Sequence, residues 1–127
     1  MTPSPQLPDE VREFVERNLD TVAQLEGLLL MRESATARWS APQLAARLYI
    51  SAQDAQTVLA ALHRRQLLEV ADGEFGYAPA NEGLRVRVDR LAAAYPRHLI
   101  AITRLIHAKP SASVRNFADA FRLRDKE

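Results

Sequence analysis

The chain contains no cysteine, and this absence removes several kinds of chemistry together. Without thiols the protein can form no disulfide, perform no thiolate catalysis and hold no cysteine-ligated zinc. Glycine is also scarce, and the four glycines are too scattered to form a glycine-rich phosphate-binding loop. The serines have no histidine and aspartate arranged near them in the sequence. We therefore expect no cofactor and no enzyme, because no nucleophile, base or cofactor-binding group can be named.

The three histidines lack the spacing of a metal site. His63, His98 and His107 form no H-E-x-x-H or similar pattern. A metal site needs about four converging ligands, and no such set is visible here. Both His63 and His107 fall near the ends of predicted helices, where a positive charge suits the helix dipole. We expect no bound metal.

Long hydrophobic runs are missing as well. The run of residues 28–31, like every other apolar run of the chain, is far shorter than the roughly 18 apolar residues that suggest a membrane span. The first ten residues, MTPSPQLPDE, lack the basic and apolar regions of a signal peptide. A length of 127 residues, with 47% hydrophobic and 26% charged, is typical of one soluble globular domain. We expect a cytoplasmic protein that does not enter a membrane.

Charge is unevenly distributed along the chain, although the net charge is only +1. Residues 1–40 carry four arginines against seven acidic residues, a net −3, and residues 41–80 carry three against four, a net −1. Residues 81–127 carry ten basic residues against five acidic ones, a net +5. The positive field is therefore expected at the C-terminal end rather than on the central segment.

Helical periodicity and capping residues predict the helices in the first half of the chain. Residues 1–8, with three prolines, are expected to be a flexible arm, followed by a helix from residue 9. A second helix is predicted from an N-cap at Asp20 to about residue 32. After a short strand at residues 37–39, capping boxes at Ser40 and Ser51 begin two further helices. We expect their apolar faces to share one interior, formed by Leu44, Leu48, Leu59 and Leu62.

The second half begins with a predicted hairpin. Residues 67–70 and 75–78 are strand candidates on either side of Asp72 and Gly73, a dipeptide typical of tight hairpin turns. Asn81 is then expected to cap a helix, which Pro96 either kinks or ends. An apolar stripe continues to residue 106, and residues 111–127 form an amphipathic tail.

Two short helices followed by a hairpin are the order of a helix-turn-helix with a wing. On the segment RWSAPQLAARLYISAQDAQTVLAALHRRQLLEVADGEFGYAP, residues 38–79, the chain resembles the winged helix-turn-helix superfamily, most closely the MarR-like bacterial regulators. The whole chain is also similar to short, poorly characterised bacterial proteins with a FADAFRLR-like C-terminal tail. The resemblance implies a mainly α fold with a small β-hairpin wing and flanking N- and C-terminal helices, over residues 9–110.

The resemblance also implies a function, a transcriptional regulator that binds duplex DNA as a homodimer. Helix 51–65 would be the recognition helix, and its glutamines could hydrogen-bond adenine. The residues expected to face bases are Gln53, Gln56 and Thr57. Those expected to face phosphates are Arg38, Arg47, Arg64 and Arg65.

The sequence departs from the family at three places. Thr57 stands where such regulators often carry a basic residue, and Gln66 replaces the glycine usually found before the wing strand. The wing itself carries Asp72 and Glu74 where a basic residue would approach the minor groove. Because phosphate neutralisation dominates DNA affinity, an acidic wing opposes DNA binding.

The alternative is therefore a winged-helix module that binds another protein and not DNA. It would hold its partner with helix 81–108 and with the tail residues Phe117, Phe121 and Leu123. Burial of one phenylalanine is worth about 1.5–3 kcal/mol, so the tail is expected to dock on the chain's own core, on a partner or on a second subunit. The arginines of helix 81–108 are either a solvated polar face or a surface for an acidic partner.

Overall fold

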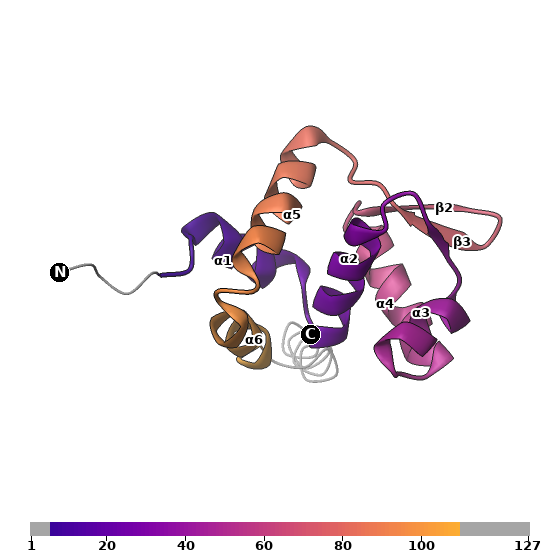
Figure 1. Ribbon diagram of the computed structural model, residues 1–127, viewed down its shortest axis with the longest axis horizontal. Coiled ribbons are helices and arrows are strands. Elements are labelled where there is room, and N and C mark those ends of the chain that lie inside the picture. Colours follow the sequence, from indigo (N-terminus) through magenta and orange to yellow (C-terminus); the bar gives the residue numbers. More distant parts are fainter. Residues whose placement is uncertain (1–5, 110–127) are drawn as a thin grey trace, which may run out of the picture.

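Six helices and a three-stranded sheet make up residues 6–109, the part of the chain that the computed structural model describes (Figure 1). In chain order the elements are α1 (Asp9–Asn18), α2 (Val22–Glu33), β1 (Arg38–Trp39), α3 (Ala41–Leu48), α4 (Ala52–Arg64), β2 (Leu68–Ala71), β3 (Glu74–Tyr77), α5 (Glu82–Ala94) and α6 (Leu99–His107). Figure 1 shows α3, α4 and the sheet at one end, α1, α5 and α6 at the other, and α2 between them. The predicted mainly helical fold with a small β element is confirmed at this level.

Short polar side chains start the helices, as the sequence predicts for α3, α4 and α5. The Ser40 hydroxyl accepts a hydrogen bond from the Gln43 amide, and the Gln43 side chain accepts one from the Ser40 amide. Ser51 and Asn81 each accept a hydrogen bond from the amide three residues later. Such caps satisfy amide groups that the first helical turn leaves without partners.

The predicted N-cap of α2 is wrong by one position. Thr21, not Asp20, has the extended backbone of the cap, and its hydroxyl accepts a hydrogen bond from the Gln24 amide. The Gln24 side chain in turn accepts a hydrogen bond from the Asp20 amide, at 2.8 Å. The carboxylate of Asp20 forms ion pairs with Lys109 and Arg65 from distant parts of the chain.

The sheet contains the predicted hairpin and the short strand before α3. Its strand order is β1-β3-β2, with both pairs antiparallel, and Phe75 lies opposite Trp39 on one side and Val70 on the other. Asp72 and Gly73 have φ angles of 54° and 77°, the left-handed conformation that tight hairpin turns require. The hairpin packs against two helices, with β2 on α4 and β3 on α2.

The interior is built where α2, α3 and α4 meet. Leu44, Leu59 and Leu62 are fully buried in one cluster, and the half-buried Leu48 packs against it, as expected. A Cβ added to Gly27 of α2 would lie 3.1 Å from the Val58 side chain, so a glycine at this position lets α2 approach α4 closely. Burial of apolar side chains here fixes the relative positions of α3 and α4.

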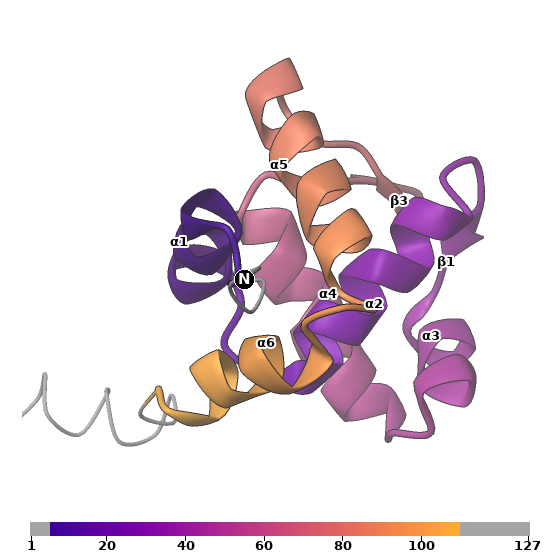
Figure 2. The same ribbon diagram turned by 60° about the vertical axis from the view of Figure 1, so that its left-hand side comes forward.

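The other end of the molecule departs from a single helix over residues 81–108. α5 ends at Ala94, just before Pro96, and α6 begins at Leu99, so the proline ends the helix rather than kinking it. Both helices pack against α1, as Figures 1 and 2 show. The C-terminal residue of this region, Lys109, donates hydrogen bonds to the backbone carbonyls of Glu16 and Leu19, at 2.7 and 2.8 Å.

The two predicted terminal segments fall largely outside the described residues. The tail 111–127, with Phe117, Phe121 and Leu123, lies beyond them, as do the first five residues of the arm predicted over 1–8. Within that arm, Leu7 is only 6% exposed and belongs to the hydrophobic core. The packed part of the chain therefore begins before α1.

Candidate functional site

The outward face of α4 carries the three residues predicted to face bases. Gln53, Gln56 and Thr57 are all exposed, while the opposite face, with Val58 and Leu59, is buried. The Thr57 hydroxyl donates a hydrogen bond to the Gln53 backbone carbonyl at 3.1 Å, so its one proton is already used. Within the described range no hydrogen bond occupies either glutamine side chain, and both keep a free amide donor and acceptor.

A shallow depression borders this face on the side of α2 and α6. Thr57, Ala61 and Arg64 line it from α4, opposite residues of the start of α2 and of the end of α6. Of the seven residues predicted to contact DNA, only Thr57 and Arg64 meet here. Arg64 has no ion-pair partner among residues 6–109.

The other three predicted phosphate ligands lie on three different elements, with Arg65 at the C-cap of α4, Arg38 in β1 and Arg47 in α3. Arg65 lies 3.8 Å from the Asp20 carboxylate. Arg38 crosses the sheet above Gly76 to reach Glu69 at 3.7 Å. The Arg38–Glu69 pair is exposed, and such pairs are worth about 0–1 kcal/mol, whereas the Asp20 side chain that pairs with Arg65 is only 22% exposed.

The hairpin offers no positive charge to a nucleic acid. Asp72 and Glu74 are exposed at its turn, and neither strand, LEVA or EFGY, contains a basic residue. The buried hydroxyl of Tyr77, at the base of the hairpin, has no hydrogen-bond partner within residues 6–109. Burial raises the pKa of Tyr77, and the Asp89 carboxylate of α5 raises it further, against a lowering by Arg85 and Arg32.

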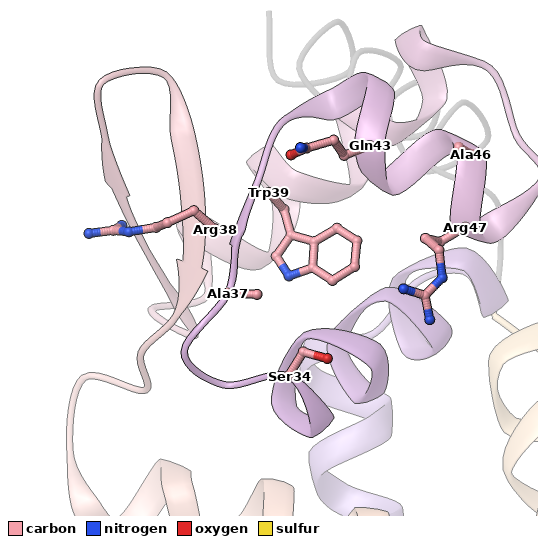
Figure 3. A pocket seen from close by; sticks show the side chains of 7 residues that line it. All are labelled: Ser34, Ala37, Arg38, Trp39, Gln43, Ala46 and Arg47. Carbon is pink, nitrogen blue, oxygen red and sulfur yellow. The ribbon is translucent and has the colours of Figure 1, made fainter.

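An open groove of about 460 Å³ lies between the end of α2, β1 and α3, and none of its lining residues comes from α4 (Figure 3). It is lined by Ser34, Ala37, Arg38, Trp39, Gln43, Ala46 and Arg47. The guanidinium carbon of Arg47 lies 5.7 Å from the centre of the Trp39 ring, within the range of a cation–π contact. Arg47, predicted as a phosphate ligand, therefore belongs to this groove.

Two residues of interest carried no clear signal in the sequence. Tyr49, in the turn between α3 and α4, is 94% exposed and has a φ angle of 58°, which a tyrosine rarely adopts. Trp39 is the one tryptophan of the chain and is buried beside Arg47. Its place in a strand was predictable, but a contact with a residue eight positions later on another element was not.

No known family is identified for the chain by similarity to other proteins. The chain matches no protein-family model, no curated protein and no solved structure. The structure defines a mainly helical protein with a small three-stranded antiparallel sheet.

Two further features are absent from residues 6–109, a metal-binding cluster and a membrane-spanning helix. No group of three or more histidine, aspartate or glutamate side chains in this range is placed to hold a metal ion. In the same range, every helix is too short or too polar to cross a bilayer.

Proposed function

We propose that this protein is a transcriptional regulator of the winged-helix type, which binds duplex DNA as a homodimer. The observation that carries the proposal is the outward face of α4, the second helix of a helix–turn–helix pair followed by a hairpin. On that face Gln53 and Gln56 are exposed and free of hydrogen bonds within the described range. A helix of this kind fits the major groove, where glutamine can pair with both polar atoms on the edge of adenine.

Affinity would come from the arginines around the recognition helix. Arg64 is free of ion pairs in the described part of the chain, and Arg65 and Arg38 hold only exposed or partly exposed carboxylates. Their transfer to phosphates releases counterions, which is the main source of affinity for DNA. A homodimer doubles these contacts and offsets the acidic hairpin, whose Asp72 and Glu74 would stay away from the duplex.

Titration with duplex DNA of random sequence tests the proposal. At low salt we expect measurable affinity at micromolar protein, falling steeply as salt rises. Arg64→Gln should weaken binding to all sequences and reduce the salt slope by about one for each phosphate that is no longer neutralised. Arg104→Gln, an exposed arginine on α6, is the matched control and should change neither quantity. If the dimer binds no DNA at low salt, the proposal is wrong.

A second candidate is a protein-interaction module, and the surface of α6 favours it. Leu99 and Ile100 are 47% and 66% exposed at the start of this helix, in the most positively charged third of the chain. Exposed apolar side chains beside arginines are typical of protein interfaces. A protein that binds no DNA but loses self-association or a co-purifying partner on Leu99→Ser with Ile100→Ser would establish this function instead.

A further inference from the structure

The groove beside Trp39 combines three features of a ligand site. Its wall is mostly apolar, formed by the Trp39 ring, Ala37 and Ala46. Arg47 places a positive charge over the ring, and no carboxylate pairs with it in the described part of the chain. The Trp39 side chain is 7% exposed, yet its indole N–H has no hydrogen-bond partner within residues 6–109.

The unpartnered indole N–H is the most informative of these features. A buried donor without an acceptor costs about 1–3 kcal/mol, so native proteins rarely leave one in that state. Figure 3 shows the indole nitrogen turned toward Ala37 and Ser34, with the Arg47 guanidinium on the other side of the ring. An acceptor that entered the groove at the Ser34 end would satisfy this donor.

The remaining polar groups of the groove are also donors. The Gln43 side-chain oxygen is occupied by the Ser40 amide, which leaves the amide nitrogen of Gln43 as its free group. The Ser34 hydroxyl makes no hydrogen bond within the described range and can donate. A groove whose free groups are one guanidinium and several hydrogen-bond donors favours an acceptor-rich anion over a neutral or cationic molecule.

The charge count narrows the class of anion. Arg38 also lines the groove, but its side chain points away from it and reaches Glu69 (Figure 3). One unpaired guanidinium therefore serves the site, which suits a single negative charge better than a phosphate dianion. The planar fork of arginine matches the geometry of a carboxylate. The apolar wall requires that the carboxylate carry a hydrocarbon body.

We propose that the groove of Trp39 and Arg47 is a binding site for a small organic monocarboxylate with an apolar body. The carboxylate would pair with Arg47 and accept hydrogen bonds from the indole N–H and the Ser34 hydroxyl, while the hydrocarbon part would cover the Trp39 ring and Ala46. No lining residue of the groove comes from α4, so this proposal does not depend on whether the protein binds DNA.

The single tryptophan makes this site directly observable. Trp39 fluorescence is recorded while DNA-free protein is titrated with cyclohexanecarboxylate, a probe that does not absorb where indole is excited. We expect a saturable change that the neutral cyclohexanecarboxamide does not reproduce at equal concentration. Free N-acetyltryptophanamide, titrated in parallel, corrects for quenching that involves no site.

Variants identify the residue that recognises the charge. Arg47→Gln should weaken binding of cyclohexanecarboxylate about tenfold or more, the loss expected for one charge-assisted hydrogen bond. Arg47 is exposed on α3, so circular dichroism should show that the variant folds as the wild type does. Arg104→Gln makes the same charge change on α6, away from the groove, and should leave the affinity unchanged.

Three results would overturn the proposal. The first is a fluorescence change that does not saturate and is no larger than that of free N-acetyltryptophanamide. The second is binding of cyclohexanecarboxamide as tight as that of cyclohexanecarboxylate. The third is binding of cyclohexanecarboxylate by Arg47→Gln as tight as by the wild type. If inorganic phosphate displaces cyclohexanecarboxylate at equal concentration, the groove is a general anion site and the carboxylate assignment is wrong.

Discussion

The end of the molecule formed by α3, α4 and the sheet differs from the end formed by α1, α5 and α6 in the range of its polar contacts (Figure 1). In the first, the side-chain hydrogen bonds that begin helices join residues three apart, as from Ser40 to Gln43. In the second, an ion pair joins Arg90 to Glu10, 80 residues earlier, and Lys109 reaches a carbonyl 93 residues earlier.

The two ends of the molecule are stabilised by different kinds of contact. At the end formed by α3, α4 and the sheet, local caps begin the helices and apolar burial joins them, while the longer-range ion pairs of Arg38 and Arg65 add little stability. The other end needs contacts between the first and last described parts of the chain to stay in place. We expect substitutions at the two ends of the molecule to act through different forces, and the following variants separate them.

The largest effect is expected from Leu59→Ala, in the interior of the end formed by α3, α4 and the sheet. Leu59 is fully buried, and such truncations cost about 2–5 kcal/mol in the free energy of unfolding. Urea denaturation measures the change, and Gln53→Ala on the exposed face of the same helix is the control, with a change below about 0.5 kcal/mol. Equal effects of the two variants would mean that α4 does not pack by this face.

An intermediate effect is expected from Lys109→Met at the other end. This change removes two hydrogen bonds to the carbonyls of Glu16 and Leu19 and an ion pair with Asp20 at 3.0 Å. We expect a loss of about 1–2 kcal/mol in the free energy of unfolding, reduced by salt, since hydrogen bonds to charged groups are the stronger kind.

The control for Lys109 is Arg104→Met, which removes an exposed cation from the helix that Lys109 follows. It should change the free energy of unfolding by less than about 0.5 kcal/mol. If both variants lose the same stability, α6 is not fastened to α1 through Lys109.

A gain in stability is expected from Gln66→Gly, between α4 and β2. Gln66 has a φ angle of 64°, a left-handed conformation that glycine adopts without strain. Its backbone hydrogen bonds to His63 and Ala80 do not involve the side chain and should remain. We expect a gain of about 0.5–1 kcal/mol, because the strain of the left-handed residue exceeds the entropy cost of glycine.

The same substitution within a helix should act in the opposite direction. Gln56→Gly, in the interior of α4, should lose about 1 kcal/mol in thermal or urea unfolding, because glycine is a poor helix former. A loss of stability on both changes would show that the left-handed backbone at Gln66 carries no strain.

The smallest effect is expected on the pH dependence of stability, through Tyr77 of β3 and its neighbour Asp89 of α5. Because burial and then Asp89 raise the pKa of Tyr77 above its usual value of 10.0, the folded state holds the proton more tightly than the unfolded state. The resulting stability is present below the unfolded pKa and is lost as pH rises through the folded pKa.

Tyr77→Phe removes this group and should make the free energy of unfolding fall less steeply than in the wild type between about pH 9 and 11. Tyr49→Phe, at an exposed ring, controls for the loss of one tyrosine. Parallel pH curves of Tyr77→Phe and the wild type would contradict burial of the hydroxyl.

The sequence separation of these contacts also explains which elements could be predicted from the sequence. Ser40 with Gln43, and Asp72 with Gly73, act over a few residues, so the starts of α3 and the hairpin were predictable from local chemistry. The N-cap of α2 was misplaced because Asp20 and Thr21 are both good caps. In the structure Thr21 is the cap, and Asp20 pairs with the distant Lys109.

The residues of the candidate site also fall into a predictable group and an unpredictable group. Helical spacing alone placed Gln53, Gln56 and Thr57 on one exposed face, since exposure on a helix follows its period. The fate of the arginines was not predictable, because Arg38, Arg47 and Arg65 each find a partner on another element. Side chains with several possible partners are placed by tertiary structure, which local sequence does not determine.

The central claim is that the outward face of α4 binds duplex DNA, and Ala60 tests it most directly. Ala60 is half-buried between Gln53 and Arg64 on that face, so Ala60→Glu would set a negative charge against the duplex. Ala80→Glu makes the same charge change in the exposed loop before α5. In a binding titration at one fixed salt concentration, our account predicts at least a tenfold loss of DNA affinity for Ala60→Glu and little loss for Ala80→Glu. Equal affinities of the two variants would contradict it.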